Sequence, residues 1–151
     1  MKKPDILQFQ TEVERGTGAL YRDYHVNGRR LADLVDTRGH ISPFGWTTED
    51  YQEQFRRQLL LEEEPEQDPD RIPLFVCHIC ADYLCGYFST LITCEDDRII
   101  WSDLRMGHID YPPPDNISTY VLQPEDSRRW LRFSFDADEY RAAIEKGTRN
   151  P

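Results

Sequence analysis

The chain has 151 residues and a formal net charge of −10, with 28 acidic against 18 basic side chains. Phosphate backbones and anionic lipid surfaces repel a protein this acidic, so we expect no direct nucleic-acid binding and no membrane binding. The length fits one domain and the 12% aromatic content argues against disorder, so the sequence predicts a single folded domain over 1–151.

The first elements along the chain are predicted to be two strands and a short helix. Apolar and polar side chains alternate over 6–13 and again over 20–26, which is typical of strands. Asn27-Gly28 then predicts a tight turn. Apolar side chains at helical spacing, beginning with Leu31, predict a short helix after this turn.

A longer amphipathic helix is predicted over about 48–62. Thr47 is the expected N-cap, since its hydroxyl can accept a hydrogen bond from a backbone N–H of the first turn. Tyr51, Phe55 and Leu59 recur every four residues and form the apolar stripe of this helix.

The helix is followed by an acidic segment, a buried strand and a hairpin. Residues 62–70 contain six acids, two prolines and no base, so they are predicted to form a solvated loop. The dense apolar run 72–79 predicts a buried strand. Two β-rich runs, 87–94 and 99–104, are joined by the four residues 95–98 and predict a hairpin.

The C-terminal part is predicted to be irregular at first and then to form a strand and a helix. Three consecutive prolines at 112–114 make 106–116 an unfavourable place for sheet or helix. Alternation over 130–135 predicts a strand, and Asp136 is the expected N-cap of a helix that ends at Gly147. Because no series of βαβ units occurs, we predict an α+β fold: a mostly antiparallel sheet with two or three helices packed on one face.

Four cysteines, Cys77, Cys80, Cys85 and Cys94, fall within 18 residues and form the most specific local feature. No apolar signal-peptide core follows the N-terminal lysines, and no apolar stretch is long enough to cross a bilayer, so we expect a cytoplasmic protein. In a reducing cytosol, cysteines are thiols or metal ligands rather than disulfides.

Three interpretations of the cysteine spacing stay open. The C-x2-C-x4-C segment can hold zinc with Cys94, His78 or His108 as the fourth ligand, as in a structural zinc-binding module. The pair Cys77 and Cys80 can instead form a redox dithiol. The cysteines can also be small apolar side chains packed in the core. Because a second metal-ligand pair is missing, we assign no metal ligand and no cofactor from the sequence.

No catalytic motif points to an enzyme. The sequence has no G-x-S-x-G, P-loop, G-x-G-x-x-G or H-E-x-x-H segment, and its histidines, His25, His40, His78 and His108, lack paired-ligand spacing. Asp103 follows an apolar run and is a weak catalytic candidate, but a solvated edge position or a salt bridge to an arginine is its expected role. We therefore predict no catalytic residue.

The cysteine segment and its flanking patterns resemble a known protein family. The segment 74–86 carries V-C-x-x-C-x-D-x-x-C-G, and the strand 100–103 carries W-x-D. Together with the I-S-P-F-G-W run at 41–46, these patterns are similar to a family of small uncharacterised bacterial proteins whose members are often labelled oxidoreductases. The resemblance extends over about residues 20–145 and implies one bacterial cytosolic domain with a non-accidental cysteine pattern.

Size, charge and the missing catalytic motifs together favour a binding protein over an enzyme. We predict an immunity protein that neutralises a cognate bacterial toxin, expected to be a basic nuclease, by covering its active site with carboxylates. The partner-binding residues predicted from the two acidic segments are Glu62, Glu63, Glu64, Glu66, Asp96 and Asp97. The alternative is a structural zinc-binding module or a Cys-dependent redox protein.

Overall fold

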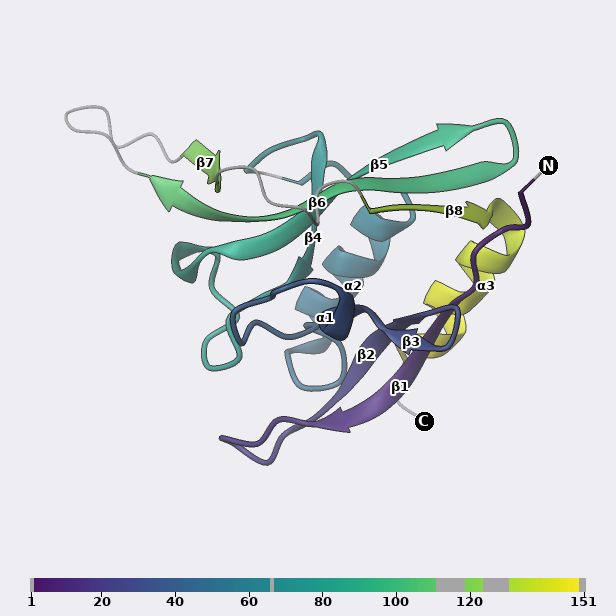
Figure 1. Cartoon of the computed structure of the whole chain (residues 1–151). Coiled ribbons are helices and arrows are strands. Elements are labelled where there is room, and N and C mark those ends of the chain that lie inside the picture. The colour runs from purple at the N-terminus through teal and green to yellow at the C-terminus, as the bar shows by residue number, and fades with distance from the viewer. Residues whose placement is uncertain (1, 66, 111–118, 124–130, 150–151) are drawn as a thin grey trace.

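The computed structural model describes residues 2–65, 67–110, 119–123 and 131–149 (Figure 1). Its elements in chain order are β1 (Leu7–Val13), β2 (Leu20–Val26), β3 (Arg29–Arg30), α1 (Leu31–Leu34), α2 (Glu49–Leu59), β4 (Arg71–Phe75), the 3-10 turn η1 (Tyr83–Cys85), β5 (Tyr87–Glu95), β6 (Arg98–Asp110), β7 (Thr119–Leu122), β8 (Arg132–Asp136) and α3 (Ala137–Gly147). Glu66 and the prolines at 112–114 lie outside the described residues.

The strands form two antiparallel sheets. β1, β2 and β3 form the smaller sheet, and β4-β5-β6-β7 form the larger one, in which β8 also pairs with β6. β6 is long enough for two neighbours, since β8 pairs with Arg98 to Ser102 and β7 with Gly107 to Asp110. The predicted α+β class with mostly antiparallel strands is confirmed, and the strands divide between two sheets.

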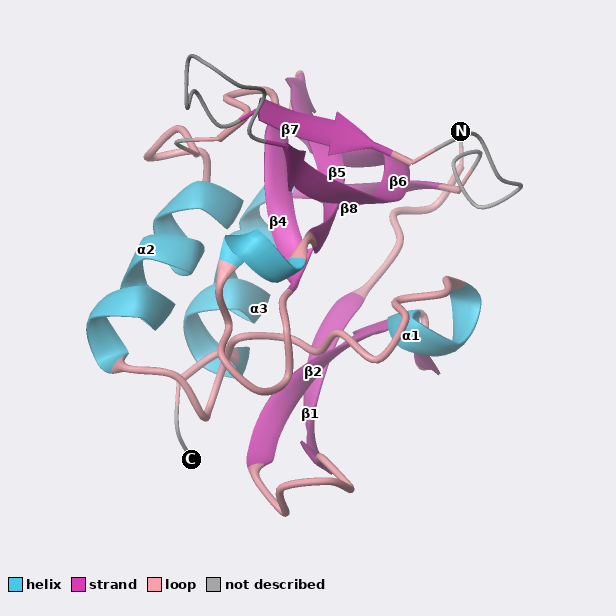
Figure 2. Ribbon diagram, turned by 90° about the vertical axis from the view of Figure 1, so that its left-hand side faces the viewer, coloured by secondary structure: helices cyan, strands magenta, loops and turns pink. Residues whose placement is uncertain are grey.

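The two longer helices lie on one side of the strands and tie the sheets into a shared hydrophobic core (Figure 2). On α3, the Tyr140 hydroxyl donates to the Leu59 carbonyl oxygen of α2 at 2.7 Å and accepts from Trp101 Nε1 of β6 at 3.2 Å. At the end of α3, the Phe9 ring of β1 packs so close to Gly147 that a Cβ there would lie 2.4 Å from it. No helix in the described part of the chain is long and apolar enough to cross a membrane.

The N-terminus of α2 begins one residue later than predicted. Thr48 is the N-cap, and its Oγ1 accepts a hydrogen bond from the Tyr51 backbone N–H at 3.3 Å. The predicted cap, Thr47, donates its hydroxyl hydrogen to the Pro43 carbonyl oxygen at 2.8 Å instead. The prediction was wrong because two adjacent threonines offer the same cap chemistry, and only the loop before them selects one.

Two strands also differ from prediction. The predicted strand 72–79 ends at Phe75, since the chain turns into the cysteine loop, and only Val76 continues as an isolated bridge. Residues 106–110, predicted to be irregular, extend β6 and pair with β7, which the sequence did not predict.

Candidate metal centre

A loop of ten residues, 77–86, carries three of the four cysteines and joins β4 to β5. β4 is buried along its whole length, and the bridge between Ile41 and Val76 fixes the chain where the loop starts. At the other end, Gly86 has φ +81° and lies against β6, where an added Cβ would be 2.7 Å from the Gly107 carbonyl oxygen. The cysteine loop is therefore held at its start by the bridge to Ile41 and at its end by the contact with β6.

The first half of the cysteine loop is a tight turn around the Cys77 sulfur. The Ala81 N–H donates to the Cys77 carbonyl oxygen at 2.9 Å, and Ala81 has a positive φ of 56°. The Cys77 sulfur accepts backbone hydrogen bonds from Ile79 and Cys80. A C-x-x-C turn of this kind places two sulfurs on one side of the chain, as a tetrahedral metal site requires.

The second half returns the chain through η1 and places the third sulfur. The Asp82 carboxylate caps η1 by accepting from the Leu84 N–H at 2.9 Å, and the Cys85 N–H donates to the Asp82 carbonyl oxygen at 3.2 Å. The Sγ atoms of Cys77, Cys80 and Cys85 consequently all lie within 4.8 Å of one another. We call these three side chains the thiol cluster.

The thiol cluster lies at the surface. Cys80 and Cys85 are exposed, Cys77 is partly exposed, and the sulfurs of Cys80 and Cys85 are 3.4 Å apart. The interpretation of these cysteines as buried core side chains is therefore wrong. Cys94 is exposed on β5, opposite Ile99 of β6, and is not part of the cluster.

Hydrogen bonds to and between the thiols shift the pKa values of Cys77 and Cys85 in opposite directions. Partial burial raises the pKa of Cys77, but the backbone N–H groups of Cys80 and Ile79 and the neighbouring thiols outweigh it, so the pKa of Cys77 lies below its usual value. Side-chain hydrogen bonds with Cys80 and Cys77 raise the pKa of Cys85 to about 12. The Cys77 thiolate therefore forms more readily than the Cys85 thiolate, and a bound cation would favour ionisation of Cys85.

The aromatic side chains of α2 support the cysteine loop from beneath. The Tyr51 hydroxyl donates to the Ala81 carbonyl oxygen at 2.6 Å. The Tyr83 ring packs against Tyr51, Phe55 and Tyr87, with centroids 6.5, 6.3 and 4.8 Å away. The loop is thus anchored to the core on its inner side while its sulfurs face outward.

The predicted acidic partner site divides into two separate surfaces. Glu62, Glu63 and Glu64 are exposed and line a hollow between α2 and β4. Asp96 and Asp97 form the turn between β5 and β6 and line another hollow that also contains Arg98 and Arg132. These two hollows have no lining residue in common, and Glu66 lies outside the described residues.

Asp103 has the structural role expected from the sequence. Its carboxylate is 3.1 Å from Nη1 of the buried Arg71 and 2.8 Å from Nε of Arg105. Arg71 also donates to the Ser89 hydroxyl and carbonyl oxygens. Asp103 therefore compensates a buried cation between β4 and β6.

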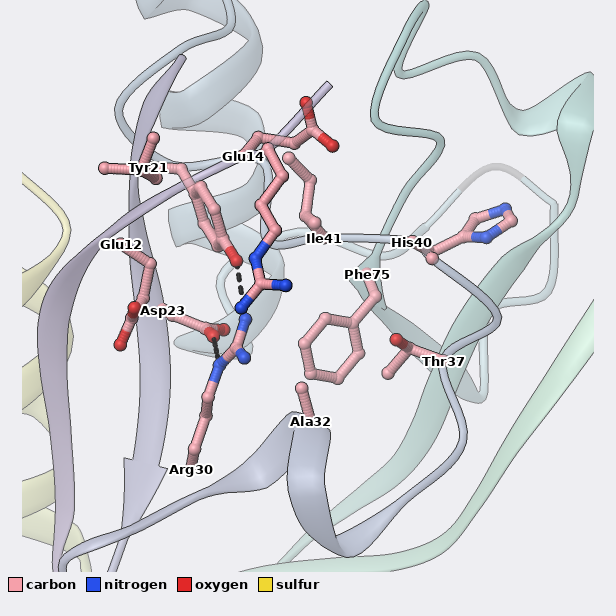
Figure 3. Close-up of a pocket in the computed structure, with 13 residues that line it drawn as sticks. Glu12, Glu14, Tyr21, Asp23, Arg30, Ala32, Thr37, His40, Ile41 and Phe75 are labelled. Atoms are coloured by element: carbon pink, nitrogen blue, oxygen red, sulfur yellow. Dashed lines mark hydrogen bonds and ion pairs between the residues drawn. The ribbon is translucent and has the colours of Figure 1, made fainter. Parts of the chain in front are cut away.

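A polar cavity of about 400 Å³, which the sequence did not predict, lies between the smaller sheet and the segment 37–41 (Figure 3). In it, Arg30 donates from Nε to the buried Asp23 carboxylate and from Nη2 to the Tyr21 hydroxyl, both at 2.6 Å. His40 also lines this cavity, but its ring points away from it. Arg30 is thus already paired within the fold.

Comparisons with known proteins give no relative from which a role can be transferred. No family model, no curated protein and no solved structure matches the chain. The family resemblance of the cysteine segment stays a prediction, and function must be argued from the residues themselves.

Proposed function

We propose that the chain binds one Zn²⁺ ion through Cys77, Cys80 and Cys85 and uses it as a structural cross-link of the cysteine loop. The observation that carries this proposal is the convergence of three sulfurs within 4.8 Å on a loop anchored at both ends. Thiolates of this kind are standard ligands of structural zinc sites.

The cluster's electrostatics favour a divalent cation over three free thiols. Zinc binds thiolates and releases their protons, so the ion takes the place of the hydrogen bonds with Cys80 and Cys77 that raise the pKa of Cys85. The exposed side chains of Ile79 and Leu84 show that few apolar contacts hold the outer part of this loop. A metal cross-link supplies order there that packing does not.

The test is a titration of the reduced full-length protein with Co²⁺ and Zn²⁺. The proposal predicts binding of one ion per chain with sulfur-to-cobalt charge-transfer absorption. Cys80→Ser should abolish tight binding, and Cys94→Ser, the matched control outside the cluster, should leave it unchanged. Equal binding by both variants, or no binding by the unmodified chain, would overturn the proposal.

We propose as a second function that the acidic surface binds a basic protein, as an immunity protein binds its toxin. In support, Glu62, Glu63 and Glu64 are exposed and form no ion pair with another described residue, on a chain of net charge −10. Unpaired carboxylates raise the association rate with a cationic partner and can cover its phosphate-binding groove. This function is compatible with zinc, because the acidic hollow and the thiol cluster share no residue.

The test of this second function is rescue of growth. The product of the adjacent reading frame is expressed with and without this chain, and survivors are counted. Restored growth, lost on reversing Glu62, Glu63 and Glu64 to lysine and kept on reversing the exposed Asp138 of α3, would support the proposal. If the triple variant still restores growth, the toxin does not bind at Glu62, Glu63 and Glu64, and the proposal for this surface is wrong.

A further inference from the structure

The thiol cluster supplies three ligands, and a tetrahedral zinc ion takes four. We propose that the His40 imidazole is the fourth, which makes the site a three-cysteine, one-histidine zinc centre. This inference rests on the proposed zinc binding and names the residue that completes it.

The backbone places His40 beside the first cysteine. Ile41 and Val76 form an antiparallel bridge, in which Ile41 N donates to Val76 O at 2.8 Å and Val76 N to Ile41 O at 2.7 Å. In antiparallel pairing, the residue before one partner lies opposite the residue after the other. His40 therefore lies across from Cys77, although 36 residues separate them in the sequence.

The side chain of His40 lies beside the third cysteine. Its Nε2 is 3.2 Å from the Cys85 carbonyl oxygen, and its Nδ1 is 3.4 Å from the Arg38 carbonyl oxygen. Figure 3 shows the ring pointing out of the polar cavity. His40 therefore lies near two of the three cysteines. Its backbone is opposite Cys77, and its ring is beside the carbonyl oxygen of Cys85.

The contacts of the ring are compatible with metal binding at Nε2 in one of its two neutral tautomers. A neutral imidazole has one N–H, so it can donate to only one of the two carbonyl oxygens that face its nitrogens. When Nδ1–H donates to Arg38, the Nε2 lone pair faces the Cys85 oxygen without a hydrogen between them. Metal-binding histidines commonly donate their other N–H to a backbone carbonyl, and in this tautomer Nδ1 would donate to the Arg38 carbonyl oxygen.

Binding requires the His40 ring to turn. His40 is not among the groups within 4.8 Å of the three sulfurs, so Nε2 must move from the carbonyl of Cys85 towards the sulfur of the same residue. The backbone of His40 can stay in place, since its N–H donates to Thr37 O at 3.0 Å and the Ile41 bridge follows directly.

The fourth ligands offered by the sequence fit less well. Cys94 is on β5 near the acidic turn, and His108 is on β6 opposite Val121. His78 lies inside the C-x-x-C turn, between Cys77 and Cys80. For none of these three side chains does the structure show a contact with a cluster cysteine like that of the His40 ring with the Cys85 carbonyl oxygen.

The experiment compares Co²⁺ binding and spectra in the full chain and its histidine variants. His40→Ala should weaken Co²⁺ and Zn²⁺ binding by at least about tenfold and change the tetrahedral ligand-field bands. His78→Ala and His108→Ala should match the unmodified protein. His40→Cys should restore tight tetrahedral binding with stronger sulfur charge-transfer absorption, which a merely structural role of His40 would not produce.

The outcomes separate this inference from the proposed function. If Cys80→Ser loses the metal while His40→Ala keeps the unmodified affinity and spectrum, zinc binding stands and His40 is not a ligand. If the unmodified chain binds no metal, both the proposed zinc binding and the assignment of His40 as a ligand are overturned. Circular dichroism of each metal-free variant identifies unfolding, and if His40→Ala unfolds, His40→Cys decides the question.

Discussion

The Tyr51 hydroxyl of α2 donates a 2.6 Å hydrogen bond to the carbonyl oxygen of Ala81, in the middle of the cysteine loop. Ala81 is buried and has a positive φ of 56°, a conformation that costs energy for a residue with a Cβ. This bond therefore holds the turn between Cys80 and Cys85 in the shape that brings the sulfurs together, and it links the proposed metal centre to the core.

Tyr51→Phe should weaken metal binding several-fold and destabilise the fold by about 1 kcal/mol, the typical net value of one hydrogen bond. The reason is that the Ala81 carbonyl loses its partner. Tyr21→Phe is the control, since it removes a tyrosine hydroxyl that accepts from Arg30 at the polar cavity. It should change stability and leave Zn²⁺ affinity unaltered. Equal affinity of Tyr51→Phe and the unmodified chain would show that α2 does not position the loop.

The same tyrosine predicts a response to alkaline pH. Burial, followed by the charge of Asp82, raises the pKa of Tyr51 from 10.0 to about 12. The folded state thus keeps the phenol proton where the unfolded chain loses it, so this contribution to stability is present below about pH 10 and is lost towards pH 12. Urea unfolding of the unmodified chain and Tyr51→Phe should show their stability difference shrinking across this window. A constant difference would contradict the prediction.

Gly86→Ala tests the close approach of the cysteine loop to β6. Gly86 and Gly28 have nearly equal φ values, +81° and +79°, but only at Gly86 would a Cβ meet a backbone atom, at 2.7 Å. Gly28→Ala should cost about 1 kcal/mol from backbone strain alone. Gly86→Ala should cost at least about 1 kcal/mol more, because Gly86 combines its positive φ with a ψ of 167°, which glycine almost alone adopts, and because the loop must shift. Thermal unfolding of both variants measures the difference, and equal losses would exclude a tight contact.

Arg30→Leu should destabilise the protein in a pH-dependent way. The Asp23 side chain is 1% exposed, and Arg30, which is 34% exposed, compensates its charge. We expect a loss of about 2–3 kcal/mol near pH 7, somewhat less than for a fully buried pair, because part of Arg30 is solvated.

The sign of the pH effect follows from Asp23. Burial raises its pKa above the usual 3.8 despite the hydrogen bond from Arg30. Above pH 3.8 the folded state therefore holds this proton more tightly than the unfolded chain, and stability falls as pH rises towards the folded-state pKa. Without Arg30 this pKa rises further, so the loss should be smallest near about pH 4. A loss that is equal at both pH values would contradict this account.

The sequence predicted best what depends on near neighbours. The spacing of Tyr51, Phe55 and Leu59 predicted α2, and the alternation over 20–26 predicted β2 with its observed bounds. The C-x2-C-x4-C spacing indicated that one loop could bring three sulfurs together, and the structure places them within 4.8 Å of one another. These patterns are local because helix and strand periodicity and tight turns involve residues only a few positions apart.

Features that depend on distant contacts could not be predicted. Cys94 looked like a fourth member of the group, but a rigid strand carries it away from the cluster. His40 belongs to no sequence motif that would have singled it out. It lies beside the cysteine loop because Ile41 and Val76 form a bridge, and this contact joins distant parts of the chain. The presence of Arg132 beside Asp96 could not be predicted either. Arg132 is on β8, which reaches the hairpin only because β8 pairs with β6.

The most direct test of the zinc centre is X-ray absorption spectroscopy at the zinc edge of the metal-loaded, full-length protein. Coordination by Cys77, Cys80, Cys85 and His40 predicts three sulfur neighbours at about 2.3 Å and one nitrogen neighbour at about 2.0 Å. A first shell of oxygen and nitrogen atoms without sulfur would contradict the assignment of the thiol cluster as a metal site.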